Sequence, residues 1–462
     1  MSAHAAGSTL PARAVDRTDR PAWHATSTFA VAIALGLVIA GVGVLTSRVD
    51  VVLLALPLLL STALGLDRRP PAGAPCALRV DVARRAGAED AEGAEGDERD
   101  RGASAFAYRV TIEAPAGAEL VHLRLTTQGA QRHDLVLAAR PRAEATGSIP
   151  VLHSGPQRVV EVGYRLVGVD GGWRSTPAPW DVVERVVEPA LAPVASIPLP
   201  HRLTGLAGVH GSARRGDGGE FRDVHPYAPG DRLRRIDFKA TARRSQGTGA
   251  LYVRRTDATS DATVVLVIDG REDVGERVES WSAPRIGGGG LGSMDLAREA
   301  AASLAAAAIG AGDRVGLIDL AAPDGVIAAG SGRRHLDRLL RRIAVSGASG
   351  TRLALRRAPV VPPGAIVYLL SPFLDDDVAA IAALWRAAGH RVVGVDLLPT
   401  PWLDGSAPYT RLAHRVVLAE RRRRVADVRA NGVELFRWQE DAERPSRAVA
   451  LRTLARAGRR RR

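Results

Sequence analysis

The sequence predicts a multidomain chain with an N-terminal transmembrane helical hairpin, an antiparallel β-sandwich and a doubly wound α/β domain. Three patterns carry this prediction. Two uncharged apolar runs follow one another near the N-terminus, period-two alternation fills residues 76–190, and continuous apolar strands then alternate with helices. With 462 residues, 46% of them apolar, the chain is long enough to build several buried cores.

Composition excludes some classes of protein. The single cysteine, Cys76, can form neither an internal disulfide nor a thiolate cluster for zinc or iron–sulfur. The formal net charge of +13 comes almost entirely from arginine, because Lys239 is the only lysine. Together with the abundant alanine, this indicates a coding bias, so the charge is weak evidence for a polyanionic partner and nucleic acid is not an expected ligand.

The first apolar run, Thr28–Leu45, has 18 residues, and the second, Val51–Leu66, has 16 and contains Pro57. Crossing a bilayer takes about 20 residues, so residues 28–66 are predicted to form a membrane hairpin. The alternatives are a signal peptide and a buried core hairpin. A signal peptide would end at a small-residue cleavage site, without a second apolar run directly behind it.

The arginines around the hairpin predict its orientation. Three precede it, one lies in its loop and two follow it: Arg13, Arg17 and Arg20, then Arg48, then Arg68 and Arg69. Because cytoplasmic flanks are enriched in positive charge, both termini are expected in the cytoplasm, with residues 1–27 as a cytoplasmic N-terminal segment. The chain is therefore expected in the inner or plasma membrane, as a two-pass protein.

After a Pro/Arg/Gly linker, alternating apolar and polar residues predict the β-sandwich over residues 76–190. Its strands are expected at 77–82, 106–112, 120–125, 134–137 and 159–167, with a long surface loop over 87–102. His122, His133 and His153 lie in different predicted elements without the short spacing of metal ligands, so surface histidines are the favoured interpretation.

Residues 200–258 form a dense pattern of glycines, acids and arginines, which we call the signature segment. Its candidate interaction residues are His210, Ser212, Arg214, Gly216, Glu220, Phe221, Tyr227, Gly230, Asp231, Arg234, Asp237, Lys239 and Arg243. The pattern resembles that of the bacterial domain-of-unknown-function 58 family, which runs roughly G-x-H-x-S-x-x-x-G-x-G-x-E-F, R-x-Y-x-P-G-D and R-x-I-D-W-K-x-x-A-R. Two positions depart from it: His225 replaces an arginine and Phe238 a tryptophan.

The residues of the signature segment allow two interpretations. Glu220, Asp231 and Asp237 could each accept a guanidinium, with Arg214, Arg234, Arg243 and Arg254 as donors, which favours a structural clamp. The alternative is a recognition surface for a phosphate-bearing ligand or an acidic partner. Lys239 supports the alternative, because a chain that otherwise uses arginine has a compact ammonium there.

Residues 259–425 are predicted to form the α/β domain. Strands are expected at 263–269, 314–320, 365–370 and 391–398, with helices between them. In the family that the signature segment resembles, this portion is similar to the von Willebrand factor type A domain. Residues 426–462 are expected to be a basic C-terminal segment, and the runs Arg421–Arg424 and Arg459–Arg462 to be solvated or membrane-surface charge.

The resemblance to type A domains implies a magnesium site with an Asp-x-Ser-x-Ser motif after the first strand. Here the corresponding positions are Asp269, Arg271 and Asp273, so a guanidinium stands where an oxygen ligand would be. We therefore predict a degenerate site without metal, in which Arg271 pairs with Asp269. The alternative is a recast acidic site of Asp269, Asp273 and one of Asp375–Asp377. The loop 287–292 has no Gly-Lys-Ser/Thr behind it and is expected to be flexible rather than phosphate-binding.

No catalytic constellation or cofactor motif is recognisable, so the chain is not expected to be an enzyme. The expected function is that of a membrane-anchored, cytoplasm-facing interaction or adaptor protein. The family resemblance implies a MoxR-type AAA+ ATPase as partner, in assembly or envelope-linked quality control. The alternative is a metal-dependent hydrolase that uses the recast acidic ligands.

Overall fold

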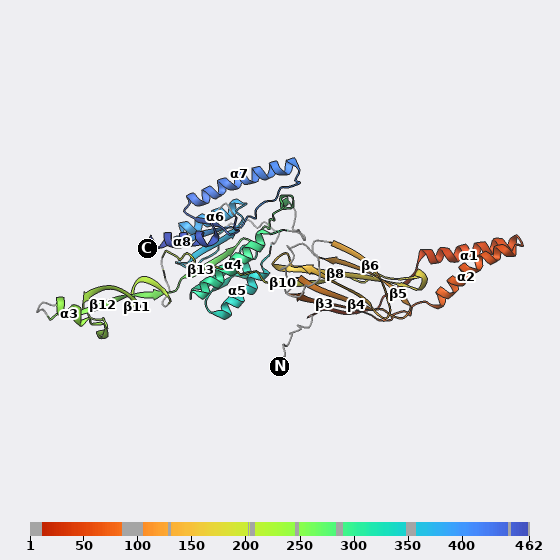
Figure 1. The fold of residues 1–462 in the computed structure, drawn as a ribbon, viewed down its shortest axis with the longest axis horizontal. Coiled ribbons are helices and arrows are strands. Elements are labelled where there is room, and N and C mark those ends of the chain that lie inside the picture. Colours follow the sequence, from red (N-terminus) through yellow and green to blue (C-terminus); the bar gives the residue numbers. More distant parts are fainter. Residues whose placement is uncertain are drawn as a thin grey trace, which may run out of the picture. The chain divides into compact units, whose positions relative to one another are not determined.

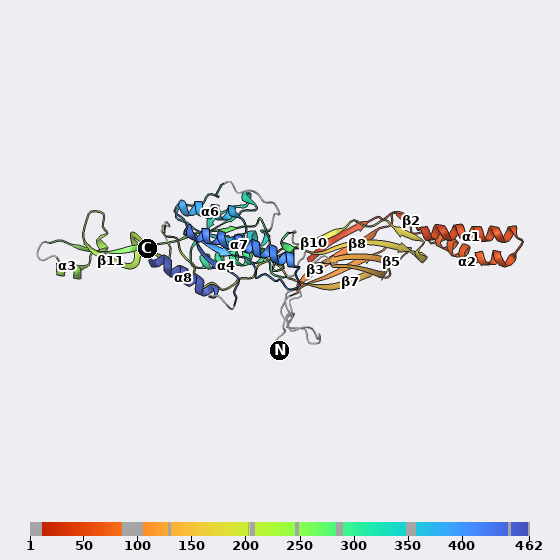
Figure 2. The same ribbon diagram turned by 90° about the horizontal axis from the view of Figure 1, so that it is seen from above.

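The computed structural model describes residues 12–85, 105–127, 131–201, 203, 208–244, 249–282, 290–347, 357–441 and 445–460. The predicted surface loop over 87–102 lies outside these residues. The chain divides into two compact units. The first comprises Met1–Leu152 with Gln157–Arg185, and the second comprises His153–Pro156 with Val186–Arg462. Figures 1 and 2 show their elements, which are described here one unit at a time.

The first unit contains two antiparallel sheets, which we call the β-domain. The first sheet has the order β1 (Ala12–Asp19), β3 (Cys76–Arg85), β4 (Ala105–Glu113), β7 (Ala143–Pro150). The second has the order β2 (Trp23–Ala25), β9 (Trp173–Ser175), β8 (Gly155–Gly168), β5 (Ala118–Thr127), β6 (Gln131–Ala138), with β10 (Asp181–Val187) also on β8. Alternate side chains such as Leu78 and Val80, or Leu123 and Leu125, are fully buried, as the period-two pattern predicts.

The N-terminal segment, which the sequence predicted only to be cytoplasmic, contributes two strands to the β-domain. Strand β1 pairs with β3 from Ala12↔Val82 to Asp19↔Cys76, and β2 pairs with β9. The buried Tyr164 donates its hydroxyl hydrogen bond to Asp19, 2.8 Å away, which fastens β1 to the domain. The sequence did not indicate β1, because this half-exposed strand is held by backbone pairing and polar contacts, which leave no apolar pattern.

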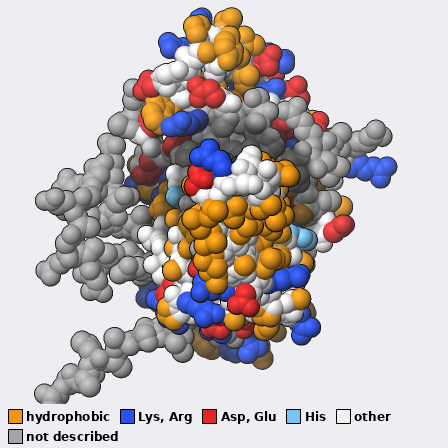
Figure 3. Space-filling view, turned by 90° about the vertical axis from the view of Figure 1, so that its right-hand side faces the viewer, with side chains coloured by type: hydrophobic (Ala, Val, Ile, Leu, Met, Phe, Trp, Pro, Cys, Tyr) orange, Lys and Arg blue, Asp and Glu red, His pale blue; other side chains and the backbone are white. Residues whose placement is uncertain are grey.

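Two apolar helices, α1 (Ser27–Leu45) and α2 (Val49–Asp67), are inserted between β2 and β3. Each is long and apolar enough to cross a membrane. They pack closely through glycine: a Cβ at Gly43 would lie 2.6 Å from Cγ2 of Val52, and one at Gly36 would lie 2.9 Å from Cδ2 of Leu59. Most other side chains of the pair are exposed, and Figure 3 shows hydrophobic side chains gathered over the face where the two helices lie.

Both ends of this helical hairpin are fixed to the β-domain at Trp173. The indole Nε1 of Trp173 donates to the carbonyl of Gly65, 2.9 Å away. Its ring lies 6.0 Å from that of Phe29 in α1, and the Arg69 guanidinium lies over it at 4.9 Å. The chain therefore leaves and re-enters the domain at the same place, which is compatible with a two-pass arrangement.

The second unit is built on a six-stranded mixed sheet. Its order is β15 (Ile327–Gly330), β14 (Arg314–Asp319), β13 (Thr263–Ile268), β16 (Ile366–Ser371), β17 (Arg391–Asp396), β18 (Glu434–Arg437). All neighbouring pairs are parallel except β14–β15, which is antiparallel. The continuous apolar strands are buried on both faces, as predicted for central parallel strands.

Helices pack on both faces of this sheet. Side chains of α4 (Ser293–Gly310), α5 (Arg333–Val345) and α8 (Arg447–Arg460) share one core with the face of β13 that carries Leu266. Side chains of α6 (Asp376–Ala387) and α7 (Pro408–Ala430) share the other core with Val265 and Val267. Strand–helix alternation in the sequence predicted this layered arrangement.

The C-terminal boundary predicted at residue 425 is wrong, because later residues complete the unit. Strand β18 is the sixth strand of the sheet, and Trp438 and Leu451 are buried in its core. Arg391 ties these parts together: its Nη2 lies 2.7 Å from Oε2 of Glu434 and 2.8 Å from the carbonyl of Leu454. The four residues of β18 were too few to recognise, and the arginines of α8 obscured its apolar face.

The segment before the signature also belongs to this unit. Ile197 is part of the α4-side core, and the buried Tyr368 donates its hydroxyl to the carbonyl of Pro198, 2.8 Å away. Nη1 of Arg391 donates to the carbonyl of Leu199 at 2.6 Å. Residues 192–199 thus pack on the sheet unit as an extended strap, although the sequence showed only a connection between two domains.

Candidate functional site

The first candidate site lies at the carboxyl ends of β13 and β16. The chain forms β14 and β15 on one side of β13, and then returns to form β16, β17 and β18 on the other. Ligands of such sheets bind where the strand order reverses in this way. Asp269 follows β13 and Ser371 ends β16, so both stand at the reversal point.

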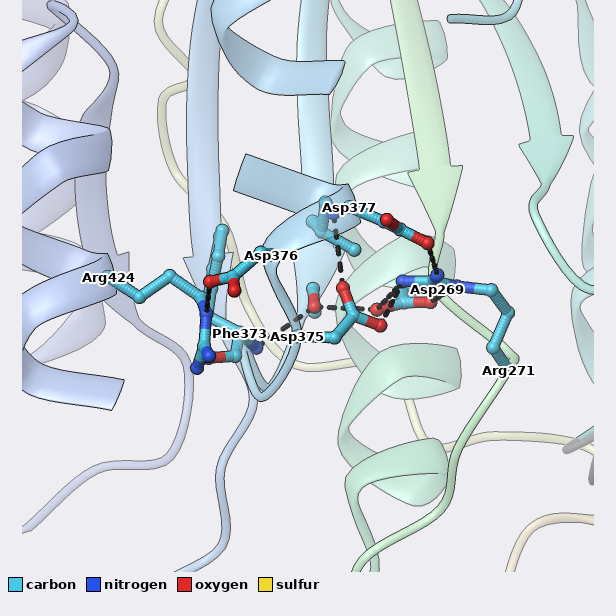
Figure 4. A network of polar contacts seen from close by, with 9 residues as sticks. Asp269, Arg271, Phe373, Asp375, Asp376, Asp377 and Arg424 are labelled. Atoms are coloured by element: carbon cyan, nitrogen blue, oxygen red, sulfur yellow. Dashed lines mark hydrogen bonds and ion pairs between the residues drawn. The ribbon is translucent and has the colours of Figure 1, made fainter. Parts of the chain in front are cut away.

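Arg271 fills this position with its guanidinium (Figure 4). Its Nε lies 2.8 Å from Oδ1 of Asp269, its Nη2 lies 2.6 Å from Oδ2 of Asp375, and its Nη1 lies 3.3 Å from Oδ2 of Asp377. Only 3% of the Arg271 residue surface is exposed. The predicted pairing with Asp269 agrees with this geometry, and the two later aspartates extend it to a cluster around one cation.

The remaining contacts of Asp269 come from β16. The Ser371 hydroxyl donates to Oδ2 of Asp269 at 2.7 Å, while Oδ1 accepts from Arg271. Burial raises the pKa of the Asp269 carboxyl, and the hydrogen bonds from Arg271 and Ser371 oppose that shift. Burial acts to lower the pKa of Arg271, but Asp269 and Asp375 more than offset it, so the guanidinium keeps its charge.

These residues do not fit a divalent cation. Such an ion needs several free oxygen ligands, yet both oxygens of Asp269 already accept hydrogen bonds and a positive guanidinium stands between the carboxylates. Asp273, the third predicted position, lies in the loop after β13, and its Oδ1 accepts from the first residues of α4: from the Ser293 hydroxyl at 3.1 Å and the Met294 N–H at 3.0 Å. The structure brings Asp269, Asp375 and Asp377 together, but not Asp273.

Two arginines of α7 contact the chain between β16 and the first turn of α6. Nε of Arg424 lies 2.5 Å from Oδ1 of Asp376, and Nε of Arg421 donates to the carbonyl of Pro372 at 2.7 Å. The prediction that Arg421–Arg424 is a run of solvated charge is therefore wrong for these two positions. Three residues apart, they share one face of the helix, whereas Arg423 is mostly exposed.

We expect that millimolar Mg²⁺ leaves the melting temperature of the protein unchanged. A site with micromolar affinity would be saturated under these conditions and would add about 4 kcal/mol of stability through linkage. Differential scanning fluorimetry with and without MgCl₂ measures the shift. An Mg²⁺-dependent rise in the melting temperature of the wild type that disappears in Asp269→Ala would show that these residues do bind the cation.

The second candidate site is the signature segment, which forms a two-stranded arm. Strand β11 (His210–Pro226) pairs antiparallel with β12 (Tyr252–Ser260), and the 3₁₀ turn Leu233–Arg235 and α3 (Phe238–Arg244) lie between them in sequence. At its base, Nε2 of His210 lies 2.9 Å from Oδ1 of Asp313. Asp313, which is fully buried, also accepts from the Ala262 N–H at 2.8 Å. Sequence reasoning did not find Asp313, because it marks no motif of its own.

The acids of the arm bind its own backbone. Oδ2 of Asp231 accepts from the Ala228 N–H at 3.0 Å, around the turn that Gly230 closes with a φ of 102°. That hydrogen bond, followed by the charge of Arg255 at 3.6 Å, lowers the pKa of Asp231. Oδ1 of Asp237 accepts from the Ala240 N–H at 2.9 Å and caps α3.

The arginine partners in the arm differ in part from those that the clamp interpretation named. The described ion pair of Asp231 is with Arg255, which was not among the predicted donors, and Arg254 lies over the Phe221 ring at 5.2 Å. The side chains of Ser212, Arg214 and Glu220 lie outside the described part of the structure, and Gly216 is described only through its backbone pairing with Thr256. The described part of the arm thus contains two carboxylate–arginine pairs, Asp231 with Arg255 at 3.6 Å and Asp257 with Arg222 at 3.2 Å, beside the backbone contacts of its acids. The clamp stays a prediction.

Large side chains of the arm are instead exposed. Phe238 is 74% exposed, Leu233 66%, Phe221 53% and Tyr227 36%. Arg234, Lys239 and Arg243 are exposed beside them. Thus most signature residues with described side chains lie on an accessible apolar and basic surface, which we call the arm surface.

These features define a class of protein: an apolar helical hairpin within a β-domain, followed by a mixed α/β unit that carries an arm and a strand-end site occupied by arginine. Residues 223–400 match the family described as "Protein of unknown function DUF58". The match runs from β11 to the segment just after β17, which confirms the resemblance over that range. No curated protein and no solved structure matches the chain.

Proposed function

We propose that this chain is a membrane-anchored adaptor that faces the cytoplasm. In this proposal the helical hairpin crosses the inner or plasma membrane, the β-domain and a von Willebrand factor type A-like sheet unit form the scaffold, and the arm surface binds the partner. The observation that carries the proposal is the exposure of Phe238, Leu233 and Phe221 on an arm whose fold is held by its own backbone contacts. Exposed aromatic residues beside arginines are typical of protein-binding hot spots.

Charge indicates what kind of surface the arm would bind. Its described residues 221–244 and 249–260 carry nine arginines and lysines against four aspartates, a net charge of +5. Such a surface complements an acidic protein patch and would speed the encounter with it. The family resemblance suggests a MoxR-type AAA+ ATPase as this partner, acting in assembly or envelope-linked quality control.

The hydrolase alternative has less support. It requires oxygen ligands for a catalytic metal, whereas the carboxylates at the end of β13 and β16 are bound to Arg271. We therefore retain the adaptor as the function that the geometry supports best.

Replacing Phe238 or Lys239 with alanine is expected to reduce partner recovery by about tenfold or more, because hot-spot residues contribute about 2 kcal/mol or more to binding. Both side chains are exposed, so the stability should change by less than about 0.5 kcal/mol. Co-purification with the candidate ATPase, quantified by mass spectrometry, measures recovery. Arg422→Ala, an exposed charge on α7, is the matched control. Wild-type recovery by both arm variants would remove the arm surface from the proposal.

A reporter fused after Arg462 is expected to behave as cytoplasmic. Arginines flank the two apolar helices on the side of the β-domain, and positive flanks stay in the cytoplasm. Paired fusions of green fluorescent protein and alkaline phosphatase, each also placed in the loop at Ser47, measure the orientation. Phosphatase activity from the C-terminal fusion, rather than from the loop fusion, would reverse the proposed topology.

A further inference from the structure

A cavity of about 590 Å³ opens in the first unit, at the end of the β-domain where the helical hairpin is attached. Arg68 and Arg69, directly after α2, line one part of it, and Arg140, after β6, lines another. Pro71 and Val169 contribute apolar walls, and Glu119 is the one acid among its lining residues. The cavity is thus a basic pocket with apolar sides, formed within a single unit.

The three arginines leave the pocket with an excess of positive charge, because they face a single carboxylate. None of the three guanidinium groups forms an ion pair with another residue in the part of the chain that the structure describes. The guanidinium carbon of Arg69 lies over the Trp173 ring, 4.9 Å from its centroid, and such a cation–π contact leaves the positive charge without a carboxylate partner. Guanidinium groups bind phosphate oxygens through paired hydrogen bonds, so phosphate is the ligand chemistry that suits these side chains.

The position of the pocket indicates where that phosphate would come from. Helix α2 has 19 residues and is about 28 Å long, close to the roughly 30 Å of a hydrocarbon core. With α2 across the bilayer, Arg68 and Arg69 lie at the level of the lipid headgroups. This step rests on the proposed membrane anchor.

We propose that the pocket binds the headgroup of an anionic phospholipid, with its phosphate held by Arg68, Arg69 and Arg140. Pro71 and Val169 contact the less polar glycerol region beside it. Such a lipid would fix the β-domain against the membrane surface at the base of the helical hairpin. A soluble phosphate compound has the same recognition chemistry, and the experiment separates the two sources.

The test uses the full chain in detergent with dioctanoyl phosphatidylglycerol, dioctanoyl phosphatidylcholine, glycerol phosphate and inorganic phosphate, with binding followed by native mass spectrometry. We expect the phosphatidylglycerol to bind about tenfold or more tightly than the other three compounds. Arg140→Gln should lose about tenfold of that affinity, and Arg140→Lys less, because it keeps the charge but not the fork. Arg132→Gln, an exposed charge on β6 outside the pocket lining, should leave it unchanged.

Three results would overturn the proposal: equal binding of the two lipids, equal losses in Arg140→Gln and Arg132→Gln, or binding of inorganic or glycerol phosphate as tight as that of the lipid. If Arg140→Gln does not fold, Arg68→Gln replaces it with the same expectations. Carbonate extraction of cell membranes tests the anchor separately. A chain that stays in the extracted membrane but shows no preference among the lipids would refute the pocket and leave the anchor intact.

Discussion

Replacing Arg271 with alanine is expected to lower the free energy of unfolding by about 3–5 kcal/mol, because it leaves Asp269 buried without its cation. Asp375 and Asp377 would then repel the same carboxylate at the end of the central strands. For a unit of this size the loss corresponds to a fall in melting temperature of roughly 6–20 °C. Thermal unfolding of the purified full chain in detergent, followed by tryptophan fluorescence, measures it.

Two further variants show whether charge causes the loss. Arg423→Ala removes an exposed arginine from α7 and should change the stability by less than about 0.5 kcal/mol. Adding Asp269→Asn to Arg271→Ala removes the unpaired buried charge and should recover part of the lost stability. A wild-type melting temperature for Arg271→Ala would contradict the interpretation that a buried ion cluster occupies this position.

A stop codon after Ala430 is expected to abolish folding of the second unit. The truncation removes β18 and α8, exposes the edge of β17 and uncovers the core that Trp438 and Leu451 fill. It also leaves Arg391, of whose side chain only 2% is exposed, without Glu434 and the Leu454 carbonyl. Limited proteolysis, and the amount of intact truncated chain recovered in membranes relative to the wild type, measure the effect.

A stop codon after Arg456 is the control for this truncation. It keeps Leu451 and Leu454 and removes only the end of α8, so wild-type protease resistance is expected. If the chain that ends at Ala430 were equally resistant to protease, β18 and α8 would not be needed for folding of the second unit.

The sequence was informative where one local property dominates. Strands such as β13 and β16 are continuous apolar runs, and the two helices of the hairpin are longer and more apolar than their surroundings. These patterns need no knowledge of distant residues. By contrast, β1 and β18 are short or polar and depend on partners far away in the chain, so local reasoning did not indicate a strand at either place.

The strand-end site was partly predictable for the same reason. Asp269 and Arg271 are two residues apart, and parallel strands bring the residues after β13 and β16 to one edge, so a cluster with the aspartates at 375–377 could be anticipated. The turn of Asp273 toward α4 depends on the loop conformation, which has no sequence pattern. In the arm, alternating acids and arginines do not show which acids bind backbone N–H groups, as Asp231 and Asp237 do, so the partners of these acids could not be predicted.

The insertion of the helical hairpin between β2 and β3 constrains the order of biosynthesis. Strands β1 and β2 leave the ribosome before the apolar helices, but β1 finds its partner β3 only after both helices have been made. If the hairpin crosses the bilayer as proposed, a chain that inserted only one helix would leave β1 and β3 on opposite sides of the membrane. The first sheet of the β-domain could then not form, because β1 could not pair with β3. The β-domain would therefore fold completely only in chains whose two helices have both been inserted.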